Sequence, residues 1–418
     1  MNYIIINALV YISTFCYDIW KNKCFSKTSL IWLLFSFNSF FAIFFYSVSI
    51  EPYNNITLTP YVFLYLCIFF SVYPLQKLEF EKIEISNPSF LFFLIYTISL
   101  LAYTPFLENI IHIQDVFSKQ TDIAEIYDTK MDENFKKETL VNWYDPVSRY
   151  FNSVCLQLQE LTPILFFYYL TFPKIKKWVV IGLIMAILNP MLYSIALAGR
   201  GSASIAVLYI LFLYLLFRKL IPNNRSKGIK MTGFIFGGLL VLMFSIMSIA
   251  RLDAQTNNYD MISWLSLYFG ESMLNFNDRM WNAPCLMYGD YSFSFFKEFL
   301  GFDTPKGIMA CRDYWGPRLG FAIGRFFTYV GDIMGDFGKI GVVVFITIIS
   351  SSIYVYVKDR KVVNFSKLIL IILWAKVLLG GFTTYNFGTK SSSQRLLELF
   401  IICVILGYSK SYTKYINK

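Results

Sequence analysis

Histidine is almost absent from this chain: its 418 residues include one, His112. A catalytic zinc site normally needs several His, Cys or acidic ligands, and no such cluster occurs along the sequence. The P-loop and the dinucleotide fingerprint are missing, as is the Gly-x-Ser-x-Gly elbow of many hydrolases. We therefore predict no metal and no cofactor, and His112 fits an exposed loop residue better than a base.

Charged residues are also scarce, at 15% of the chain, whereas 56% of the residues are hydrophobic. Ordinary soluble domains carry about 25% charged residues. Apolar runs of roughly 20 residues recur, and each is long enough to cross a bilayer. The sequence predicts an all-α, polytopic membrane protein with one integral membrane domain over residues 1–418. About eleven spans are expected, at residues 3–20, 29–50, 57–76, 88–106, 151–172, 178–198, 202–220, 231–250, 337–357, 363–382 and 394–409.

The basic residues predict how these spans are oriented. Of the 37 lysines and arginines, 20 follow the odd-numbered spans: Lys21, Lys23, Lys27, Lys77, Lys82, Lys174, Lys176, Lys177, Arg218, Lys219, Arg225, Lys227, Lys230, Lys358, Arg360, Lys361, Lys367, Lys410, Lys414 and Lys418. Because cytoplasmic loops are enriched in Lys and Arg, we predict an outer N-terminus and a cytoplasmic C-terminus. The net charge of +10 is then a topology signal, and no nucleic-acid partner is expected.

Two segments on the predicted outer side are too long to be simple connectors. They are residues 107–150 and residues 251–336. The second is rich in Trp, Tyr, Phe and Gly, and it is predicted to fold as a cap at the membrane surface. Helical pieces are expected in it near 261–276 and 321–330.

Arg200 lies in the shortest predicted outer loop, within Ala198-Gly199-Arg200-Gly201-Ser202. A permanent charge at membrane depth is costly and is rarely retained for packing alone. The small residues that follow begin a helix whose free N–H groups point the same way, an arrangement that binds anions. Flanking glycines let a phosphate approach the backbone closely. Arg200, Gly201 and Ser202 are therefore predicted to form part of an anion site.

Further arginines share this predicted outer side or its rim: Arg251, Arg279, Arg312, Arg318, Arg325 and Arg395. Guanidinium groups that converge with helix N-termini suit pyrophosphate, which they bind bidentately. The alternative is that outer arginines reach towards phospholipid headgroups. We favour that alternative for Arg279.

Three carboxylates are candidates for handling a proton on the same side. Glu160 interrupts an apolar span, and Asp332 and Asp336 precede another. A glycosyl transfer needs a base for the acceptor hydroxyl or a group that stabilises an oxocarbenium-like centre. Each carboxylate is equally suited to pairing with a buried arginine. Trp315, in the predicted cap, is a candidate for stacking on a sugar, with packing of the cap as its alternative role.

Two motifs in the sequence carry a family resemblance. Residues 197–202 (Leu-Ala-Gly-Arg-Gly-Ser) resemble the Ser/Gly-Arg-Gly motif of bacterial O-antigen polymerases, the Wzy family, and of the related O-antigen ligases. Residues 336–345, beginning Asp-Phe-Gly, are similar to that family's entry into a late span. The overall plan of ten to fourteen spans with a large periplasmic loop in the C-terminal half is similar too.

This resemblance implies a GT-C-like helical fold in the bacterial inner membrane. It implies a glycosyltransferase that moves a growing glycan from undecaprenyl pyrophosphate to the non-reducing end of a new lipid-linked repeat unit, without a metal. The implied partners are undecaprenyl-pyrophosphate-linked glycans, membrane lipids and a chain-length regulator. The ligase branch uses a histidine of the periplasmic loop. Residues 251–336 contain none, which favours a polymerase over a ligase.

Together, the residues and the resemblance predict two sets of site residues. The catalytic set is Arg200, Arg251, Arg325, Asp332, Asp336 and Glu160. The substrate-binding set is Arg312, Arg318, Arg395, Gly201, Ser202 and Trp315. Arg200 is the residue best supported by the resemblance. The main alternative is that the chain is a lipid-linked oligosaccharide flippase or transporter, which would also need arginines inside its membrane domain. Transporters usually show internal repeats and pairs of broken spans, and the sequence shows neither.

Overall fold

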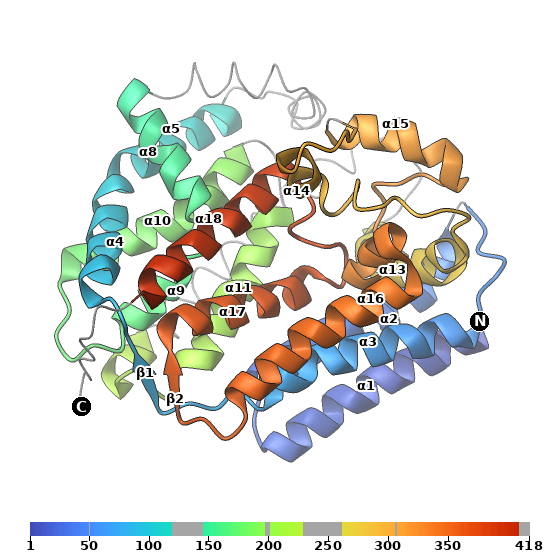
Figure 1. The fold of residues 1–418 in the computed structure, drawn as a ribbon, viewed down its shortest axis with the longest axis horizontal. Helices are drawn as coiled ribbons and strands as arrows, with labels where there is room; N and C mark the ends of the chain where they lie inside the picture. Colours follow the sequence, from blue (N-terminus) through green and yellow to red (C-terminus); the bar gives the residue numbers. More distant parts are fainter. Residues whose placement is uncertain (50, 119–144, 197–200, 229–260, 306, 409–418) are drawn as a thin grey trace. The chain divides into compact units, whose positions relative to one another are not determined.

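The computed structural model describes residues 1–49, 51–118, 145–196, 201–228, 261–305 and 307–408. It is mostly helical (Figure 1). The chain divides into two compact units. Unit 1 comprises Met1–Phe80, Tyr259–Val363 and Leu370–Phe400, and unit 2 comprises Glu81–Asn258, Asn364–Ile369 and Ile401–Lys418.

Six helices in the described part of the chain are long and apolar enough to cross a membrane. They are Asn2–Asn22, Lys27–Val48, Leu58–Gln76, Pro88–Gln114, Lys177–Ala196 and Thr328–Val357. The prediction of a helical membrane protein is therefore confirmed, while the count of eleven spans stays a prediction. The expected span at 231–250 lies outside the described residues.

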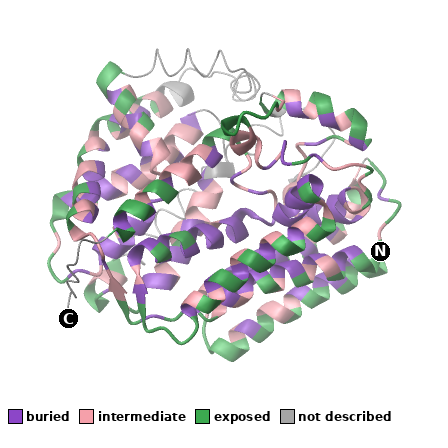
Figure 2. Cartoon of the chain, in the orientation of Figure 1, coloured by how far each residue is buried: buried purple, intermediate pink, exposed green. Residues whose placement is uncertain are grey.

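The first three spans of unit 1 are α1 (Asn2–Asn22), α2 (Lys27–Val48) and α3 (Leu58–Gln76). They lie side by side in Figure 1. The Ser26 hydroxyl accepts the Ser29 N–H at the start of α2, and this cap fixes where the helix begins. α1 leaves large apolar side chains exposed, including Trp20 at 75% and Leu9 at 58%. Figure 2 shows the exposed residues along α1; an apolar surface of this kind suits contact with lipid.

Helix α16 (Thr328–Val357) consists of two helical pieces joined at Gly338. Gly338 has φ 74°, a left-handed conformation that favours glycine. Every residue from Thr328 to Asp336 is buried, whereas the part after the kink exposes apolar residues such as Ile340. The predicted span 337–357 corresponds to this second piece. The helix expected near 321–330 instead begins at Thr328, after irregular backbone.

The predicted span at 151–172 is not one continuous helix: the chain forms α8 (Pro146–Gln157) and α9 (Thr162–Tyr169) with a turn between them. Pro163 stands in the first turn of α9, where proline is well tolerated, and it lacks the N–H that a continuous helix would bond to the Gln159 carbonyl. Glu160 lies in the turn, and the Thr162 hydroxyl donates to the Leu158 carbonyl at 2.9 Å. Hydropathy alone did not predict the break between α8 and α9.

Unit 2 is organised around α10 (Lys177–Ala196), which packs on α4 (Pro88–Leu101), α5 (Tyr103–Ser118), α8, α9 and α11 (Gly201–Phe217). A buried amide ladder crosses it: Asn109 Nδ2 donates to Asn189 Oδ1 at 2.6 Å, and Asn189 Nδ2 donates to Asn152 Oδ1 at 2.7 Å. Such ladders hold apolar helices in one register. The outer loop predicted from residue 107 thus begins later, because α5 continues to Ser118.

The remaining elements are short strands, or helices whose residues are divided between the two units. Strand β1 (Lys82–Glu84) belongs to unit 2, and β2 (Val362–Asn364) lies where the chain leaves unit 1. Two predicted spans correspond to α17 (Phe365–Gly380) and α18 (Lys390–Gly407), each shared between the units. α17 is shorter than the prediction, and α18 begins with charged residues.

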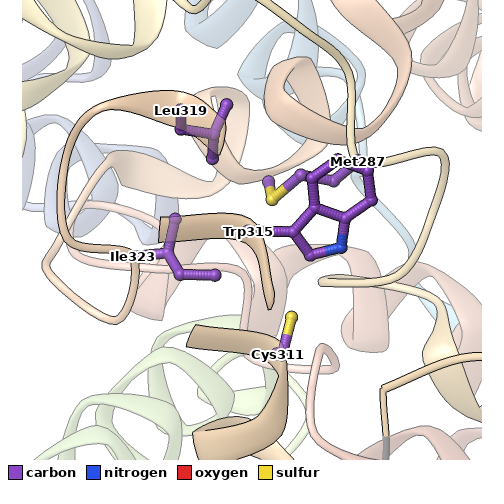
Figure 3. Close-up of a cluster of buried hydrophobic side chains, with 5 residues drawn as sticks. All are labelled: Met287, Cys311, Trp315, Leu319 and Ile323. Carbon is purple, nitrogen blue, oxygen red and sulfur yellow. The ribbon is translucent and has the colours of Figure 1, made fainter. Parts of the chain in front are cut away.

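The predicted cap separates into two parts. Its first described helix, α13 (Met261–Asp278), confirms the helix expected near 261–276 and packs against α2. It therefore belongs to the helical core of unit 1 instead of forming a layer above it. The second part contains η1 (Met280–Asn282), α14 (Ser294–Phe299) and α15 (Ile308–Leu319). Its own core comprises Met287, Cys311, Trp315, Leu319 and Ile323 (Figure 3). Cys285 and Cys311, whose pairing the sequence left open, are both free.

Gly270→Ala is expected to lower the thermal unfolding temperature in detergent. A Cβ at this position would lie 2.5 Å from the Phe41 carbonyl oxygen and 2.6 Å from its carbon, so α13 and α2 would have to separate. Overpacking of this kind costs about 1–3 kcal/mol. The control is Gly228→Ala, since a Cβ there meets nothing within 4 Å. Equal unfolding temperatures for the two variants would contradict the close helix contact.

Candidate functional site

Two arginines of unit 1, Arg279 and Arg325, donate hydrogen bonds to the carboxylate of Glu51. Arg325 approaches it with both terminal nitrogens: Nη1 donates to Oε2 at 2.9 Å, and Nη2 donates to Oε1. Arg279 Nη2 donates to Oε2 as well. Glu51 lies between α2 and α3, Arg279 directly follows α13, and Arg325 lies between α15 and α16. We refer to Arg279 and Arg325 as the arginine pair.

A second carboxylate, that of Glu271, lies behind the arginine pair. Its Oε1 is 3.8 Å from Arg325 Nη1, and its side chain is 8% exposed against 51% for Glu51. The hydrogen bond from Arg325 lowers the pKa of Glu51, and the Arg325 charge and Arg279 add to that effect. Burial raises the pKa of Glu271. The Glu271 carboxylate is thus enclosed, while the Glu51 carboxylate is half exposed, so that another anion can replace it.

Tyr53 and Asn275 hold the arginine pair in place. The Arg279 guanidinium carbon is 5.3 Å from the centre of the Tyr53 ring. The Tyr53 hydroxyl donates to Asn275 Oδ1 at 3.1 Å, and Asn275 Nδ2 donates to the Phe326 carbonyl at 3.1 Å. Three segments that are distant in sequence are therefore joined by one buried amide, which fixes the separation between the two guanidinium groups.

The arginine pair lies at one end of the α3 helix. The pair contacts the connection that precedes the start of α3. Near the other end of α3, the Tyr73 ring centre lies 5.5 Å from that of Tyr354, which is near the end of α16. Lys77 and Lys358 lie over these two tyrosine rings. α3 has 19 residues, so about 28 Å of helix separates the arginine pair from these lysines.

This arrangement is suited to binding an anion. A guanidinium fork engages a phosphate with the same bidentate geometry that it uses for a carboxylate, and the group that occupies the forks here is half exposed. Within the described ranges, no group of three or more His, Cys, Asp or Glu residues is placed to hold a metal ion.

Several predicted site residues lie elsewhere or outside the described chain. Arg200 and Arg251 are outside the described residues. Gly201 and Ser202 begin α11, in unit 2. Arg395 is half-buried in α18.

Arg312 and Arg318 extend from α15 and make contacts within the second part of the cap. Arg312 Nη2 donates to the Gly324 carbonyl at 3.4 Å, and its guanidinium lies directly over that glycine. The Arg318 guanidinium carbon lies 3.7 Å from the centre of the Tyr314 ring. The partners of both arginines in these contacts are therefore residues of the cap, and the Glu51 carboxylate is not among them.

Asp336 is fully buried and accepts three backbone hydrogen bonds. Its Oδ1 accepts from Gly289 N at 3.0 Å and Tyr291 N at 3.2 Å, and its Oδ2 accepts from Ser292 N at 2.7 Å. Both oxygens are therefore engaged in ordering the loop that follows Met287. This geometry makes Asp336 a structural anchor and leaves it poorly placed to act as a base.

The other two predicted carboxylates are also buried. Asp332, 1% exposed, accepts from Tyr385 N at 2.6 Å through Oδ2, and its Oδ1 has no hydrogen-bond partner among the described residues. Glu160, 2% exposed, belongs to unit 2, where the Tyr209 hydroxyl donates to its backbone carbonyl at 2.9 Å.

Trp315 packs the cap in this structure. Its side chain joins the cluster in Figure 3 and is 8% exposed, and its Nε1 donates to Asp290 Oδ2 at 3.1 Å. An indole this enclosed favours packing of the cap over stacking on a sugar.

Sequence reasoning found Arg325 but missed its partners. It assigned Arg279 to phospholipid headgroups, and it passed over Glu51, Glu271 and Tyr53. One signal was available, since Glu271 is an acidic residue in the middle of a helix that is otherwise uncharged up to its last residue, Asp278. Glu51 carried no comparable signal, because a single acidic residue in a short loop is common.

Comparisons of the chain with protein-family models, with curated proteins and with solved structures find no match.

Proposed function

We propose that the chain is an integral-membrane glycosyltransferase that polymerises lipid-linked oligosaccharide repeat units at the periplasmic face of the bacterial inner membrane. The observation that carries the proposal is the convergence of Arg279 and Arg325 on one exposed carboxylate. Two guanidinium groups that meet at one anion also suit a pyrophosphate leaving group. The motifs around Arg200 and Asp336, which resemble those of O-antigen polymerases, add to it.

The proposed reaction needs no external energy source. The bond between the anomeric carbon and the pyrophosphate oxygen breaks, and the acceptor hydroxyl oxygen bonds to that carbon and loses its proton. Undecaprenyl pyrophosphate leaves with the electron pair of the broken bond. The arginine pair stabilises the negative charge that grows on the leaving oxygen.

Glu51 is the candidate base in this scheme. In the structure, hydrogen bonding to Arg325 lowers the pKa of Glu51 and makes it a weak base. A pyrophosphate that takes over the guanidinium forks displaces this carboxylate and removes the hydrogen bonds that stabilise its charged form. Glu51 then becomes a stronger base beside the reacting centre, where it accepts the proton of the acceptor hydroxyl.

An accumulation assay tests the function in cells. Deletion of the gene is expected to leave single lipid-linked repeat units on the outer surface of the inner membrane and to abolish long chains. Repeat units that remain on the cytoplasmic side would overturn the proposal in favour of transport.

A transporter of lipid-linked oligosaccharides is the second candidate, because the structure contains the interrupted helices that the sequence did not reveal. Helices α8 and α9 break at a turn, and α16 breaks at Gly338. In unit 1, irregular backbone at Phe382 is buried and accepts hydrogen bonds from Asn38 and Ser272. Discontinuous helices near buried polar groups are typical of transporters.

Arg200→Ala is expected to abolish long-chain polysaccharide while the protein remains in the membrane fraction. Arg200→Lys is expected to cause a strong loss too, since lysine keeps the charge and lacks the bidentate fork. Gel ladders of surface polysaccharide, with immunoblots of membranes, measure both effects. Normal ladders from the alanine variant would contradict the predicted role of Arg200.

A further inference from the structure

A pocket of about 550 Å³ lies beside the arginine pair, in unit 1. Its lining is Asn54, Asn55, Ile56, Thr57, Trp281 and Asn282. These residues come from two segments that also carry the charged site: Asn54 follows Glu51 by three positions, and Asn282 follows Arg279 by three positions. Three residues of chain span at most about 11 Å, so the pocket and the arginine pair are neighbours.

The backbone of the pocket is fixed in place. The Asn55 N–H donates to Asp278 Oδ1 at 2.6 Å, and the Thr57 N–H donates to Asn277 Oδ1 at 3.0 Å. Asn277 Nδ2 returns a hydrogen bond to the Thr57 carbonyl at 2.8 Å. These bonds tie the segment before α3 to the end of α13, so the pocket is formed before any ligand arrives.

The side chains of the pocket remain available to a ligand. Within the described part of the chain, the side-chain amides of Asn54 and Asn55 make no hydrogen bond to another residue, and both side chains are exposed. Each amide offers both donors and an acceptor. Trp281 is partly exposed and rests against Phe63, with ring centres 5.3 Å apart.

The chemistry of this lining selects one class of ligand. None of the six lining residues is charged, so their polar and aromatic groups determine what the lining recognises. Three amides and a threonine hydroxyl beside one indole do not suit an alkyl chain. They suit a ring that has hydroxyls on its edge and C–H groups on its face, because amides pair with the hydroxyls and an indole packs against the C–H face.

We propose that this pocket binds a neutral sugar residue of a glycan, next to the anion site formed by the arginine pair. A sugar joined to a pyrophosphate would place its ring in the pocket and its phosphates in the guanidinium forks. Lys339 Nζ lies 3.6 Å from the centre of the Trp281 ring, and its side chain is exposed. Lys339 is thus the group that a sugar displaces from the indole. The assignment of this sugar to the glycan being transferred rests on the proposed function, whereas the binding of a saccharide does not.

Saturation-transfer NMR on the full-length protein in nanodiscs tests the site, with maltotriose and N,N′,N″-triacetylchitotriose as the probes. Wild-type protein is expected to transfer saturation to at least one of them. Trp281→Ala is expected to weaken binding about tenfold, which matches the loss of one aromatic contact. The double variant Asn54→Ala/Asn55→Ala is expected to weaken binding as well, with the protein still folded as judged by its thermal transition.

Trp20→Ala is the matched control, because Trp20 is an exposed indole on α1, 75% exposed, and is not part of the pocket lining. The absence of transfer to both sugars, or equal binding by wild type and Trp281→Ala, would overturn the sugar site. The assay involves no transfer reaction, so it separates the two proposals. Binding that persists in a protein unable to make polymer would refute the proposed polymerase and leave the saccharide site intact.

Discussion

Arg325→Ala is expected to lower the rate of glycan transfer by about 10²–10³-fold, the loss that follows removal of one fixed donor to a developing oxyanion. Arg325 is the residue that engages Glu51 with both nitrogens, so its fork is the strongest point of the anion site. Arg325→Lys is expected to recover little of the rate, because lysine is a point charge without the planar fork. Turnover of lipid-linked repeat units by purified protein measures the effect.

Arg318→Ala is the matched control for this loss. Arg318 is also a cap arginine, but its guanidinium lies on the Tyr314 ring, outside the arginine pair. Its removal is expected to change the rate less than threefold, a shift of about 0.65 kcal/mol or less in the activation barrier. A comparable loss from both substitutions would mean that the cap as a whole, and not the arginine pair, supports transfer.

Asp336→Ala is expected to destabilise unit 1 by about 3–5 kcal/mol, because three backbone N–H groups, two of them buried, lose a charged acceptor at once. The donors are Gly289, Tyr291 and Ser292, which order the loop between η1 and α14. The thermal transition in detergent, followed by tryptophan fluorescence, is expected to shift strongly downwards. Asp336→Asn is expected to lie between wild type and alanine, since an amide keeps one acceptor oxygen and places a donor opposite the remaining N–H.

Asp303→Ala provides the comparison, because Asp303 is an exposed carboxylate of the same cap. Its removal is expected to leave the transition within error of wild type. If the Asp336 variant unfolds at the same temperature as the Asp303 variant and transfer is nevertheless lost, Asp336 would return to the candidate bases.

The helical membrane character of the chain was predictable because it depends on local composition. Long apolar runs form helices wherever backbone groups must be satisfied without water, and α1, α2 and α3 begin and end close to where the sequence placed them. Glu160 was identified as a polar residue within an apolar span, but the break of that span into α8 and α9 was not predicted, although Pro163 marked it. The apolar residues on both sides, such as Phe166 and Phe167, dominated the hydropathy.

The arginine pair was not predictable in full, because it depends on contacts between distant segments. Glu51 is separated from Arg279 by 228 positions and from Arg325 by 274. Periodicity indicates which face of a helix is apolar, and it does not indicate which loops meet at the ends of helices. The placement of Arg279 shows the consequence: taken alone it fits a headgroup contact, and only the fold brings it to Glu51.

The most direct measurement uses purified protein in liposomes that contain lipid-linked repeat units. The released undecaprenyl pyrophosphate and the glycosidic bonds formed are counted together, for wild type and for Arg325→Ala. We expect wild type to produce a ladder of chains with one undecaprenyl pyrophosphate released per new bond, and Arg325→Ala to lose both products together. A wild-type protein that moves the repeat units across the bilayer without joining them, or an undiminished ladder from Arg325→Ala, would contradict the proposed polymerase and its anion site.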